Sequence, residues 1–362
     1  MSMPDSELDR LRDRIDALDE QVQTLLNERA SLAQRVAESK RKLEPDAVFY
    51  RPEREAEVLR KVRQRNSGPL PNDDMVRLFR EIMSACLALE QRLTIAYLGP
   101  EGTYTQAAAL KKFGHSVELK SLPAIDEIFR EVEAGGASFG VVPVENSSEG
   151  VINHTLDMFM RSPLKICGDV ELRIHHQLLS CGTTLDGIQR VCAHQQALAQ
   201  CREWLDRNLP HVERIAVSSN AEAARLARDD GSSAAIAGDT AAEVYGLTVV
   251  ARNIEDDPNN TTRFLVVGPH SAERSGSDKT SLMVTVHNKP GALYSLLEPI
   301  ARHGVSMTRI ESRPSRISKW DYVFFLDVEG HVEDDKVAAA LEALRSEATL
   351  LKVLGSYPRC EL

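Results

Sequence analysis

The sequence has few cysteines, no long hydrophobic run and no excess of positive charge. Six cysteines in 362 residues, none of them in a Cys-x-x-Cys pair, are too few for a disulfide scaffold, so we expect reduced thiols in a cytoplasmic protein. No apolar stretch reaches the roughly 18 residues of a transmembrane helix, and the acidic N-terminus lacks the apolar core of a secretion signal. Acidic residues outnumber basic ones by 54 to 44, whereas phosphate binding needs a basic surface. We therefore expect neither a membrane nor a nucleic-acid partner.

The length predicts two or three domains, at roughly 100–200 residues each. Residues 5–92 have an almost entirely helical pattern, with a first break at residues 66–69. Residues 93–268 alternate short β-branched runs with alanine-rich helical runs, which predicts βα units and a largely parallel sheet. After a polar linker, residues 280–362 have the strand–helix–strand–strand–helix–strand order of a ferredoxin-like α+β domain. We expect a multidomain protein with domains at residues 1–92, 93–272 and 278–362.

The N-terminal helix carries a heptad of apolar residues that predicts partner helices in a bundle or coiled coil. One position of this apolar stripe is Arg29, and an unpaired buried charge is costly, so Arg29 should face a bound anion or a carboxylate side chain. The alternative is a solvated helix with scattered charges. Lys40 lies about 16 Å further along the same face, close enough for both side chains to reach one small ligand. Arg12 lies about 25 Å from Arg29 on a continuous helix. If Arg12 also serves this site, a second chain must complete it.

The segment LDRLRDRIDALDEQVQTLLNERASLAQRVAESK, followed by YRPEREAEVL, resembles the all-helical chorismate mutase domain of bifunctional P-proteins. The resemblance implies an intertwined helical homodimer. It implies that Arg29, with Arg12 of the partner subunit, binds the substrate carboxylates and that Lys40 donates to the ether oxygen of chorismate. It also implies that Arg54 and Glu55 complete the pocket, with Glu55 receiving the substrate hydroxyl.

Two positions depart from the best-known bacterial pattern of that family. Arg51 stands where the pattern has an aspartate near the start of the second helix. Glu90 stands where a glutamine or glutamate donates the second hydrogen bond to the ether oxygen. Because an ionised glutamate has no proton to donate, we expect burial to raise the pKa of Glu90 and keep it neutral in the working enzyme. Mutase activity should then favour lower pH.

In the central region, polar loops are expected next to several predicted strands. In open α/β folds ligands bind beyond the carboxyl ends of the strands, and exposed helix N-termini suit carboxylate ligands. Single loops also have simpler explanations: Ser219, with Glu222, forms a capping box. We interpret His175 and His176 as structural, because no acid partner or metal spacing accompanies them in the sequence.

Taken together, GPEGTYT, VPVENSSEG, AHQQALAQC and NNTTRF resemble the prephenate dehydratase domain. The resemblance implies two α/β lobes around a cleft, similar to type II periplasmic binding proteins. Thr262 matches the essential threonine of the family and lies next to Arg263, a further expected substrate contact. Ala193 and Gln195 replace the common serine and proline of the third motif. The implied cleft residues are Glu145, Asn146, Gln200 and Ser219.

In the last region, Pro290-Gly291-Ala292-Leu293 and Glu311-Ser312-Arg313-Pro314 resemble the two motifs of the phenylalanine-binding ACT domain. The alternative is that Gly291 only makes a turn between a strand and a helix. The resemblance implies that L-phenylalanine inhibits the enzyme by binding Gly291, Ala292, Leu293, Glu311, Ser312, Arg313 and Pro314.

The sequence thus predicts a bifunctional enzyme of phenylalanine biosynthesis that acts on chorismate and prephenate. We expect no cofactor and no metal ion, because Cys192 and His194 have no second close pair of ligands. One alternative is a chorismate mutase fused to a non-catalytic amino-acid sensor, which Ala193 favours. The other is a dehydratase for arogenate, which needs a partner for the substrate ammonium group.

Overall fold

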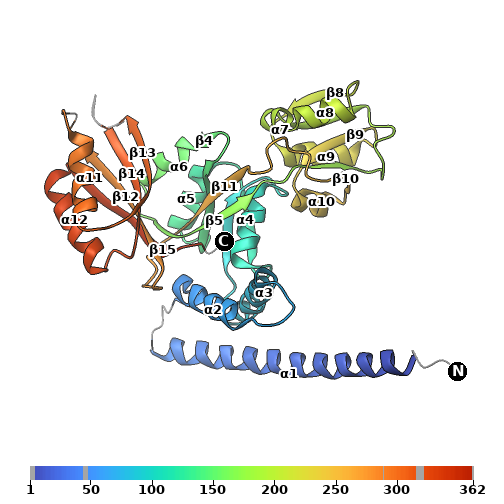
Figure 1. The fold of residues 1–362 in the computed structure, drawn as a ribbon, viewed down its shortest axis with the longest axis horizontal. Helices are drawn as coiled ribbons and strands as arrows, with labels where there is room; N and C mark the ends of the chain where they lie inside the picture. Colours follow the sequence, from blue (N-terminus) through green and yellow to red (C-terminus); the bar gives the residue numbers. More distant parts are fainter. Residues whose placement is uncertain (1–4, 44–47, 288, 315–321, 361–362) are drawn as a thin grey trace. The chain divides into compact units, whose positions relative to one another are not determined.

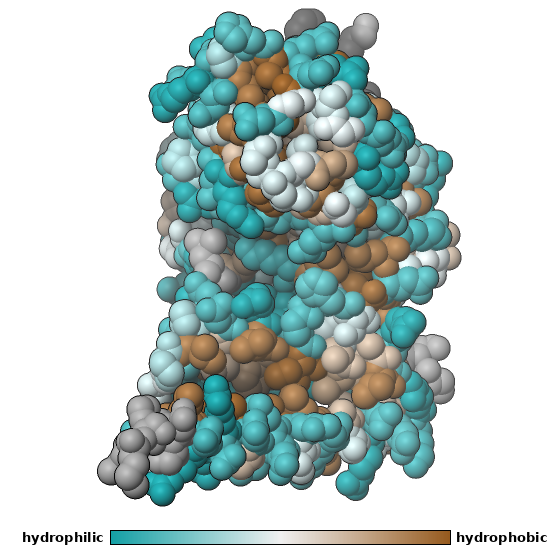
Figure 2. All heavy atoms as spheres, turned by 90° about the vertical axis from the view of Figure 1, so that its right-hand side faces the viewer, coloured by the Kyte–Doolittle hydropathy of each residue, from teal (hydrophilic) through white to brown (hydrophobic). Residues whose placement is uncertain are grey.

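The computed structural model describes residues 5–43, 48–287, 289–314 and 322–360. The chain forms two compact units, one with the N-terminal helices and one with nearly all of the chain from residue 94 onwards. Among the described residues, no helix is long and apolar enough to cross a membrane. The face drawn in Figure 2 is mostly hydrophilic, with separate hydrophobic patches between the polar side chains.

The N-terminal unit is helical, as predicted, and consists mainly of α1 (Asp5–Leu43), α2 (Pro52–Arg65) and α3 (Asn72–Glu90). α1 packs against α3, and Ala37 of α1 is buried. Towards the N-terminus the apolar stripe is open to solvent: Leu11, Leu18 and Leu25 are 57%, 44% and 63% exposed. The heptad therefore forms the predicted helix, but the single chain does not bury its stripe.

The central region forms two lobes, each with its own sheet and buried core. The sheet of the first lobe has the order β2-β1-β3-β11-β5, with β4 paired to β3. Its strands are β1 (Thr94–Leu98), β2 (Glu118–Leu122), β3 (Phe139–Asn146), β4 (Gly150–Val151), β5 (Lys165–Arg173) and β11 (Thr261–Gly268). Its helices are α4 (Tyr104–Phe113), α5 (Ile125–Glu133) and α6 (Asn153–Phe159).

The second lobe has a five-stranded sheet in the order β10-β6-β9-β7-β8. Its strands are β6 (Gln177–Ser180), β7 (Arg190–His194), β8 (Glu213–Val217), β9 (Ser233–Ala237) and β10 (Thr248–Ala251). Its helices are α7 (Gln195–Gln200), α8 (Arg202–Asn208), α9 (Asn220–Asp229) and α10 (Asp239–Tyr245). The chain enters this lobe after β5 and returns to the first lobe through β11.

The prediction of a largely parallel sheet is wrong for the strands around β11 and also for β6, which is antiparallel to β9 and β10 in the second lobe. β1 pairs in parallel with β2 and β3, but β11 is antiparallel to both β3 and β5, because it enters the first sheet from the second lobe. Its first residues therefore lie beside the last residues of β3, and Thr262 is directly opposite Asn146. Thr262 belongs to β11 itself and lies at the end of the sheet where ligands are expected.

The C-terminal region forms a four-stranded antiparallel sheet in the order β13-β14-β12-β15, with α11 and α12 side by side on one face (Figure 1). This is the predicted ferredoxin-like order. The elements are β12 (Asp278–Val286), α11 (Ala292–Arg302), β13 (Met307–Pro314), β14 (Tyr322–Glu329), α12 (Asp335–Glu347) and β15 (Leu350–Pro358).

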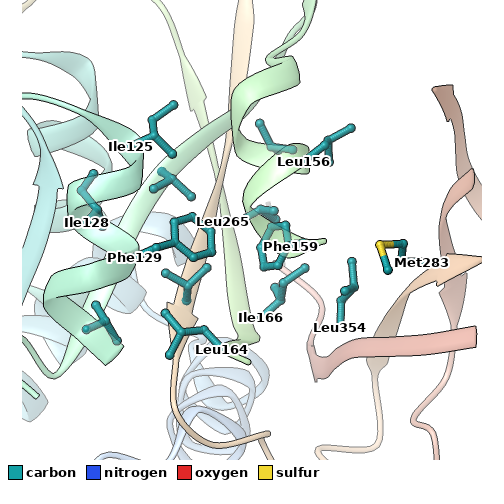
Figure 3. Close-up of a cluster of buried hydrophobic side chains, with 14 of the residues drawn as sticks. Ile125, Ile128, Phe129, Leu156, Phe159, Leu164, Ile166, Leu265, Met283 and Leu354 are labelled. Atoms are coloured by element: carbon teal, nitrogen blue, oxygen red, sulfur yellow. The ribbon is translucent and has the colours of Figure 1, made fainter. Parts of the chain in front are cut away.

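The other face of this sheet packs against the first lobe. Met283 and Leu354 of the C-terminal sheet share one buried cluster with Phe159 and Ile166 of the first lobe (Figure 3). At Gly355 of β15 the two backbones approach so closely that a Cβ atom would lie 2.1 Å from the Ile166 carbonyl oxygen. Glycine is therefore required there for the C-terminal sheet to pack against β5.

Candidate active sites

A cavity of about 80 Å³ lies where polar residues of the two lobes meet. β3 and β11 contribute Asn146 and Thr262, and α7 contributes Gln200. The structure thus brings together three residues that were predicted from three different motifs. The full lining is Tyr104, Asn146, Ile174, His176, His194, Gln196, Ala197, Gln200, Asn220, Asn260 and Thr262.

Backbone groups fix the orientation of the Asn146 side chain. Its Oδ1 accepts hydrogen bonds from the backbone N–H groups of Ser148 and Glu149, at 3.0 Å each. Because a backbone N–H can only donate, the opposite atom of the amide must be the donor Nδ2. Nδ2 donates to Thr262 Oγ1 and to Asn260 Oδ1, both at 2.8 Å. The Thr262 oxygen accepts in this contact, so the hydroxyl proton of Thr262 remains available to a ligand.

The donor and acceptor of the hydrogen bond between Asn260 and Gln200 follow in the same way. Asn260 accepts through Oδ1, so its Nδ2 is the donor to Gln200 Oε1, at 3.2 Å. Gln200 Oε1 also accepts from His176 Nε2, at 2.8 Å. The remaining amide nitrogen of Gln200 is buried and has no hydrogen-bond partner among the described residues. Gln200 can therefore donate to a ligand oxygen in the cavity.

His176 is buried and neutral. Burial lowers the pKa of its imidazole, although the hydrogen bond to Gln200 acts in the opposite direction. Since Gln200 Oε1 can only accept, the ring proton lies on Nε2, and Nδ1 accepts from the Tyr104 hydroxyl at 2.9 Å. The Tyr104 hydroxyl also lies 2.8 Å from the His175 carbonyl oxygen and shares its proton between the two acceptors. One part of the cavity lining is thus a continuous series of hydrogen bonds that runs from Tyr104 through His176 and Gln200 to Thr262.

Three residues expected in the cleft do not line this cavity. Arg263 pairs with Asp169 at 3.0 Å and Glu145 pairs with Arg309 at 2.9 Å, because alternate residues of a strand point to opposite faces. Ser219 caps α9, its Oγ accepting from the Glu222 backbone N–H at 3.0 Å. The N-cap role of Ser219 is confirmed, whereas the Glu222 carboxylate of the predicted capping box pairs with Arg225 at 2.7 Å.

In the N-terminal unit, the expected mutase residues Arg29 and Lys40 lie close enough to Glu90 to influence its ionisation. Burial raises the pKa of Glu90, and the positive charges of Lys40, Arg29 and Arg41 oppose this only in part. Arg41 also donates to the Glu90 carbonyl oxygen. The Phe49 ring lies 5.7 Å from Lys40 Nζ and 5.1 Å from the Arg41 guanidinium. Arg41 and Phe49 are additions to the predicted residue set.

The other expected mutase residues have partners of their own. Arg12 is exposed and lies 3.6 Å from Asp9 on the same helix. Arg54, in the first turn of α2, pairs with Glu57 at 2.5 Å. Glu55 is largely buried and lies 3.7 Å from Lys112 Nζ. Arg51, just before α2, is exposed.

The two predicted effector motifs lie at the same end of the C-terminal sheet. Tyr322 of β14 pairs with Val286, which precedes the first motif, and with Pro314, which ends the second. Gly291 has a φ of 80° and forms the N-cap of α11, where Ala292 and Leu293 begin the helix. Glu311 to Pro314 end the edge strand β13.

Three family models match successive parts of the chain: chorismate mutase type II over residues 11–91, prephenate dehydratase over 95–272 and the ACT domain over 280–346. A protein from Stutzerimonas stutzeri named bifunctional chorismate mutase/prephenate dehydratase is 58% identical over 360 residues, which cover 98% of this chain and 99% of that protein. The chain belongs to the bifunctional chorismate mutase/prephenate dehydratase family. The predicted order of a helical, an α/β and a ferredoxin-like domain is that of this family.

Two solved structures resemble about three quarters of this family member. The prephenate dehydratase from Arthrobacter aurescens, solved in complex with L-Phe, is 36% identical with a TM-score of 0.68 and covers 74% of this chain and 90% of its own. A protein described as a novel type of quorum quenching acylase is 31% identical with a TM-score of 0.68, covering 74% of this chain and 98% of its own. Because similar folds carry different names, function must be argued from the residues of the site.

Sequence reasoning missed several residues that line the dehydratase cavity. Asn260 stands in the motif NNTTRF, but the motif alone predicts no role for it. For His176 the sequence predicts a structural role. The acid partner that the sequence did not reveal is Glu255, which lies 2.8 Å from His175 Nδ1 and accepts from the His176 backbone N–H. No local signal could have found it, because Glu255 follows His175 by 80 residues.

Proposed function

We propose that this chain catalyses two consecutive reactions of phenylalanine biosynthesis and is inhibited by the end product L-phenylalanine. The first is the Claisen rearrangement of chorismate to prephenate, and the second converts prephenate to phenylpyruvate, CO₂ and water. The observation that carries the second step is the contact in which Thr262 Oγ1 accepts from Asn146, because it leaves the Thr262 proton for a ligand. Family membership supports both activities.

In the dehydratase reaction, the ring carboxylate leaves as CO₂ and its electron pair enters the ring. The bond between the ring and its hydroxyl breaks, and the departing hydroxide takes up one proton from the solvent to become water. Thr262 donates a hydrogen bond to this hydroxyl and stabilises the charge that develops on it. A threonine hydroxyl is a weak acid, so orientation matters more than proton release. The hydrogen bond from Asn146 strengthens Thr262 as a donor, because linked hydrogen bonds polarise one another.

The neutral lining of the cavity favours loss of CO₂. None of the lining residues that the structure describes is a lysine, arginine, aspartate or glutamate. A carboxylate bound among neutral groups is less stabilised than in water, and this cost disappears when it leaves as uncharged CO₂. The free amide nitrogen of Gln200 holds another oxygen of the substrate and so fixes its orientation.

The mutase reaction needs no nucleophile and no proton transfer. It requires the folded conformer of a dianion and hydrogen-bond donors at the ether oxygen, where negative charge develops. Lys40 and a neutral Glu90 are the proposed donors, and Arg29 binds a carboxylate. The raised pKa of Glu90 supports its protonated form.

We propose that the mutase domain works as a homodimer in the cytoplasm. The exposed stripe of α1 supplies an apolar surface for a second copy, and Arg12 of the partner subunit then completes the site that Arg29 begins. Substrate roles for Arg51, Arg54 and Glu55 belong to the same proposal. The six free cysteines suit a reducing compartment. The proposed domains are residues 1–92, 93–272 and 278–362.

We propose that L-phenylalanine binds at Gly291–Leu293 and Glu311–Pro314. Both segments lie at the same end of the C-terminal sheet, and the related structure from Arthrobacter aurescens was solved with L-Phe. Leu293 is 42% exposed, which leaves an apolar side chain available to the phenylalanine ring.

One assay tests the proposed function. Chorismate is supplied to the full-length protein, prephenate and phenylpyruvate are followed separately, and L-phenylalanine is then added. We expect both products in sequence, with inhibition of the second step. Prephenate without phenylpyruvate would identify a mutase fused to a sensor. Faster turnover of arogenate than of prephenate would contradict our substrate assignment. This assignment is supported because the described lining residues include no carboxylate that could pair with the ammonium group of arogenate.

A further inference from the structure

The two strands that carry the catalytic pair have a second face. Thr262 and Asn146 are opposite each other on the cavity side, while the neighbouring pair Arg263 and Glu145 points the other way, towards the C-terminal sheet. The pairing of β11 with β3 shifts directly after Arg263, and such a bulge redirects side chains. Arg263 and Glu145 are thus each one peptide unit away from a residue of the cavity.

Every nitrogen of the Arg263 guanidinium is held. Nε donates to Asp169 of β5 at 3.0 Å, Nη1 to Asp327 of β14 at 2.6 Å, and Nη2 to the Tyr357 hydroxyl of β15 at 3.0 Å. The Arg263 side chain is only 11% exposed. Two of its three partners, Asp327 and Tyr357, belong to the C-terminal sheet.

The charges around Arg263 are balanced across the two domains. Lys279 of β12 pairs with Asp169 at 2.9 Å, so two cations face two carboxylates. Burial by itself would raise the pKa of Asp327, but Arg263 and the Ser281 hydroxyl hold it below its usual value, so Asp327 is ionised. Removing one charge from such a buried set leaves the others unbalanced.

A second connection starts at the predicted effector motif. Arg309 lies two residues before Glu311 on the same strand β13. It pairs with Glu145 of β3 at 2.9 Å and is opposite Asp327 in the ladder between β13 and β14. At the end of the strand, Arg313 of the motif pairs with Asp157 of α6 at 2.6 Å. The strand proposed to bind the effector is thus in direct contact with the first lobe.

We propose that Arg263 and Glu145 are positioning residues for Thr262 and Asn146, and that the C-terminal domain acts on the dehydratase site through their ion pairs with Asp327 and Arg309. The inference rests on the proposed function and adds the route of regulation. An effector that binds β13 better in one arrangement than in another must also shift these ion pairs. Thr262 and Asn146 then lose the alignment that directs the threonine proton into the cavity.

The test uses full-length Asp327→Asn and its matched control Glu329→Gln. Asp327 and Glu329 lie on the same strand, and Glu329 pairs with Arg359 at 2.7 Å, away from β11. For Asp327→Asn we expect the L-phenylalanine concentration for half inhibition of the dehydratase to rise at least tenfold. Binding of L-phenylalanine, measured by calorimetry, should change less than threefold, and mutase turnover should stay as in the unchanged protein. Glu329→Gln should be inhibited normally.

Inhibition of Asp327→Asn at the same concentration as the control would overturn the inference. So would a tenfold loss of L-phenylalanine binding that accounts for the lost inhibition. If Asp327→Asn does not fold, Tyr357→Phe decides. It removes only the hydroxyl that accepts from Arg263 and contacts the Ser281 hydroxyl, which itself donates to Asp327. A rise of at least threefold is expected, and no rise refutes the route. If the unchanged protein forms no phenylpyruvate from prephenate, the proposed function fails instead, so the two failures are distinguishable.

Discussion

Asn146 Nδ2 lies 2.8 Å from Thr262 Oγ1 across neighbouring strands, and two backbone N–H groups make that nitrogen the donor. Because Asn146 Nδ2 is the donor, the donor and acceptor of each further hydrogen bond, through Asn260 and Gln200 to His176, are also determined. This assignment also explains why a threonine can serve as a donor to substrate, because the contact that orients it uses its oxygen and not its proton.

The first prediction concerns the Thr262 hydroxyl. Thr262→Val should lower dehydratase kcat by about 10²-fold or more, since one donor to developing charge has an effect of that size. Thr262→Ser keeps the hydroxyl and should retain most of the activity. Phenylpyruvate formation from prephenate measures both variants, and unchanged mutase turnover is the internal control. Full activity in Thr262→Val would refute the assigned role.

The second prediction concerns Asn260, which sequence reasoning did not assign. Asn260→Ala removes the link between Asn146 and Gln200 and should lower dehydratase kcat/KM by about tenfold, the equivalent of one lost hydrogen bond. Asn259→Ala, at the exposed neighbouring position, is the matched control and should behave as the unchanged protein. Equal kinetics for the two variants would show that the link has no part in substrate binding or turnover.

The third prediction concerns the pH dependence of the mutase. The pKa of Glu90 is raised, and the protonated form is the one that can donate, so activity should be highest at low pH and fall as the pH rises through that pKa. Glu90→Gln donates at every pH and should give a flat profile over the same range. Initial rates of chorismate consumption across the stability range of both proteins are the measurement. Parallel curves for the two proteins would remove Glu90 from the mechanism.

The fourth prediction concerns the apolar stripe of α1. Leu25→Lys places a charge in the stripe and should convert the expected dimer to monomers and abolish mutase activity, because Arg12 and Arg29 can then no longer meet. Gln23→Lys, on the same turn but outside the heptad, is the control. Sedimentation velocity gives the mass, and dehydratase turnover of both variants reports on folding of the rest of the chain. A Leu25→Lys protein that remains dimeric would contradict the proposed interface.

Local sequence patterns predicted the elements well, and motif resemblance predicted which loops would meet. The strand–helix–strand–strand–helix–strand order predicted for the C-terminal region is the order found, and Asn146, Gln200 and Thr262 come from three motifs to one cavity. Each of these signals lies within a few residues of sequence.

Local patterns could not predict that the Arg263 and Glu145 side chains point away from the cavity. This orientation depends on where β11 begins and on its register with β3, since a shift by one residue exchanges the two faces of a strand. The antiparallel direction of β11 and the pairing of His175 with Glu255 likewise depend on contacts between distant parts of the chain.

The insertion of β11 between β3 and β5 has a consequence for synthesis of the chain on the ribosome. Until residues 261–268 have emerged, the first sheet has a gap, and β3 and β5 each present an unpaired edge. Folding of that lobe must therefore wait for the whole second lobe to be made, and the strand that closes the sheet is also the one that delivers Thr262. A nascent chain can neither complete this core nor act on prephenate prematurely, and a chain that stops before residue 261 should aggregate through its open sheet edges.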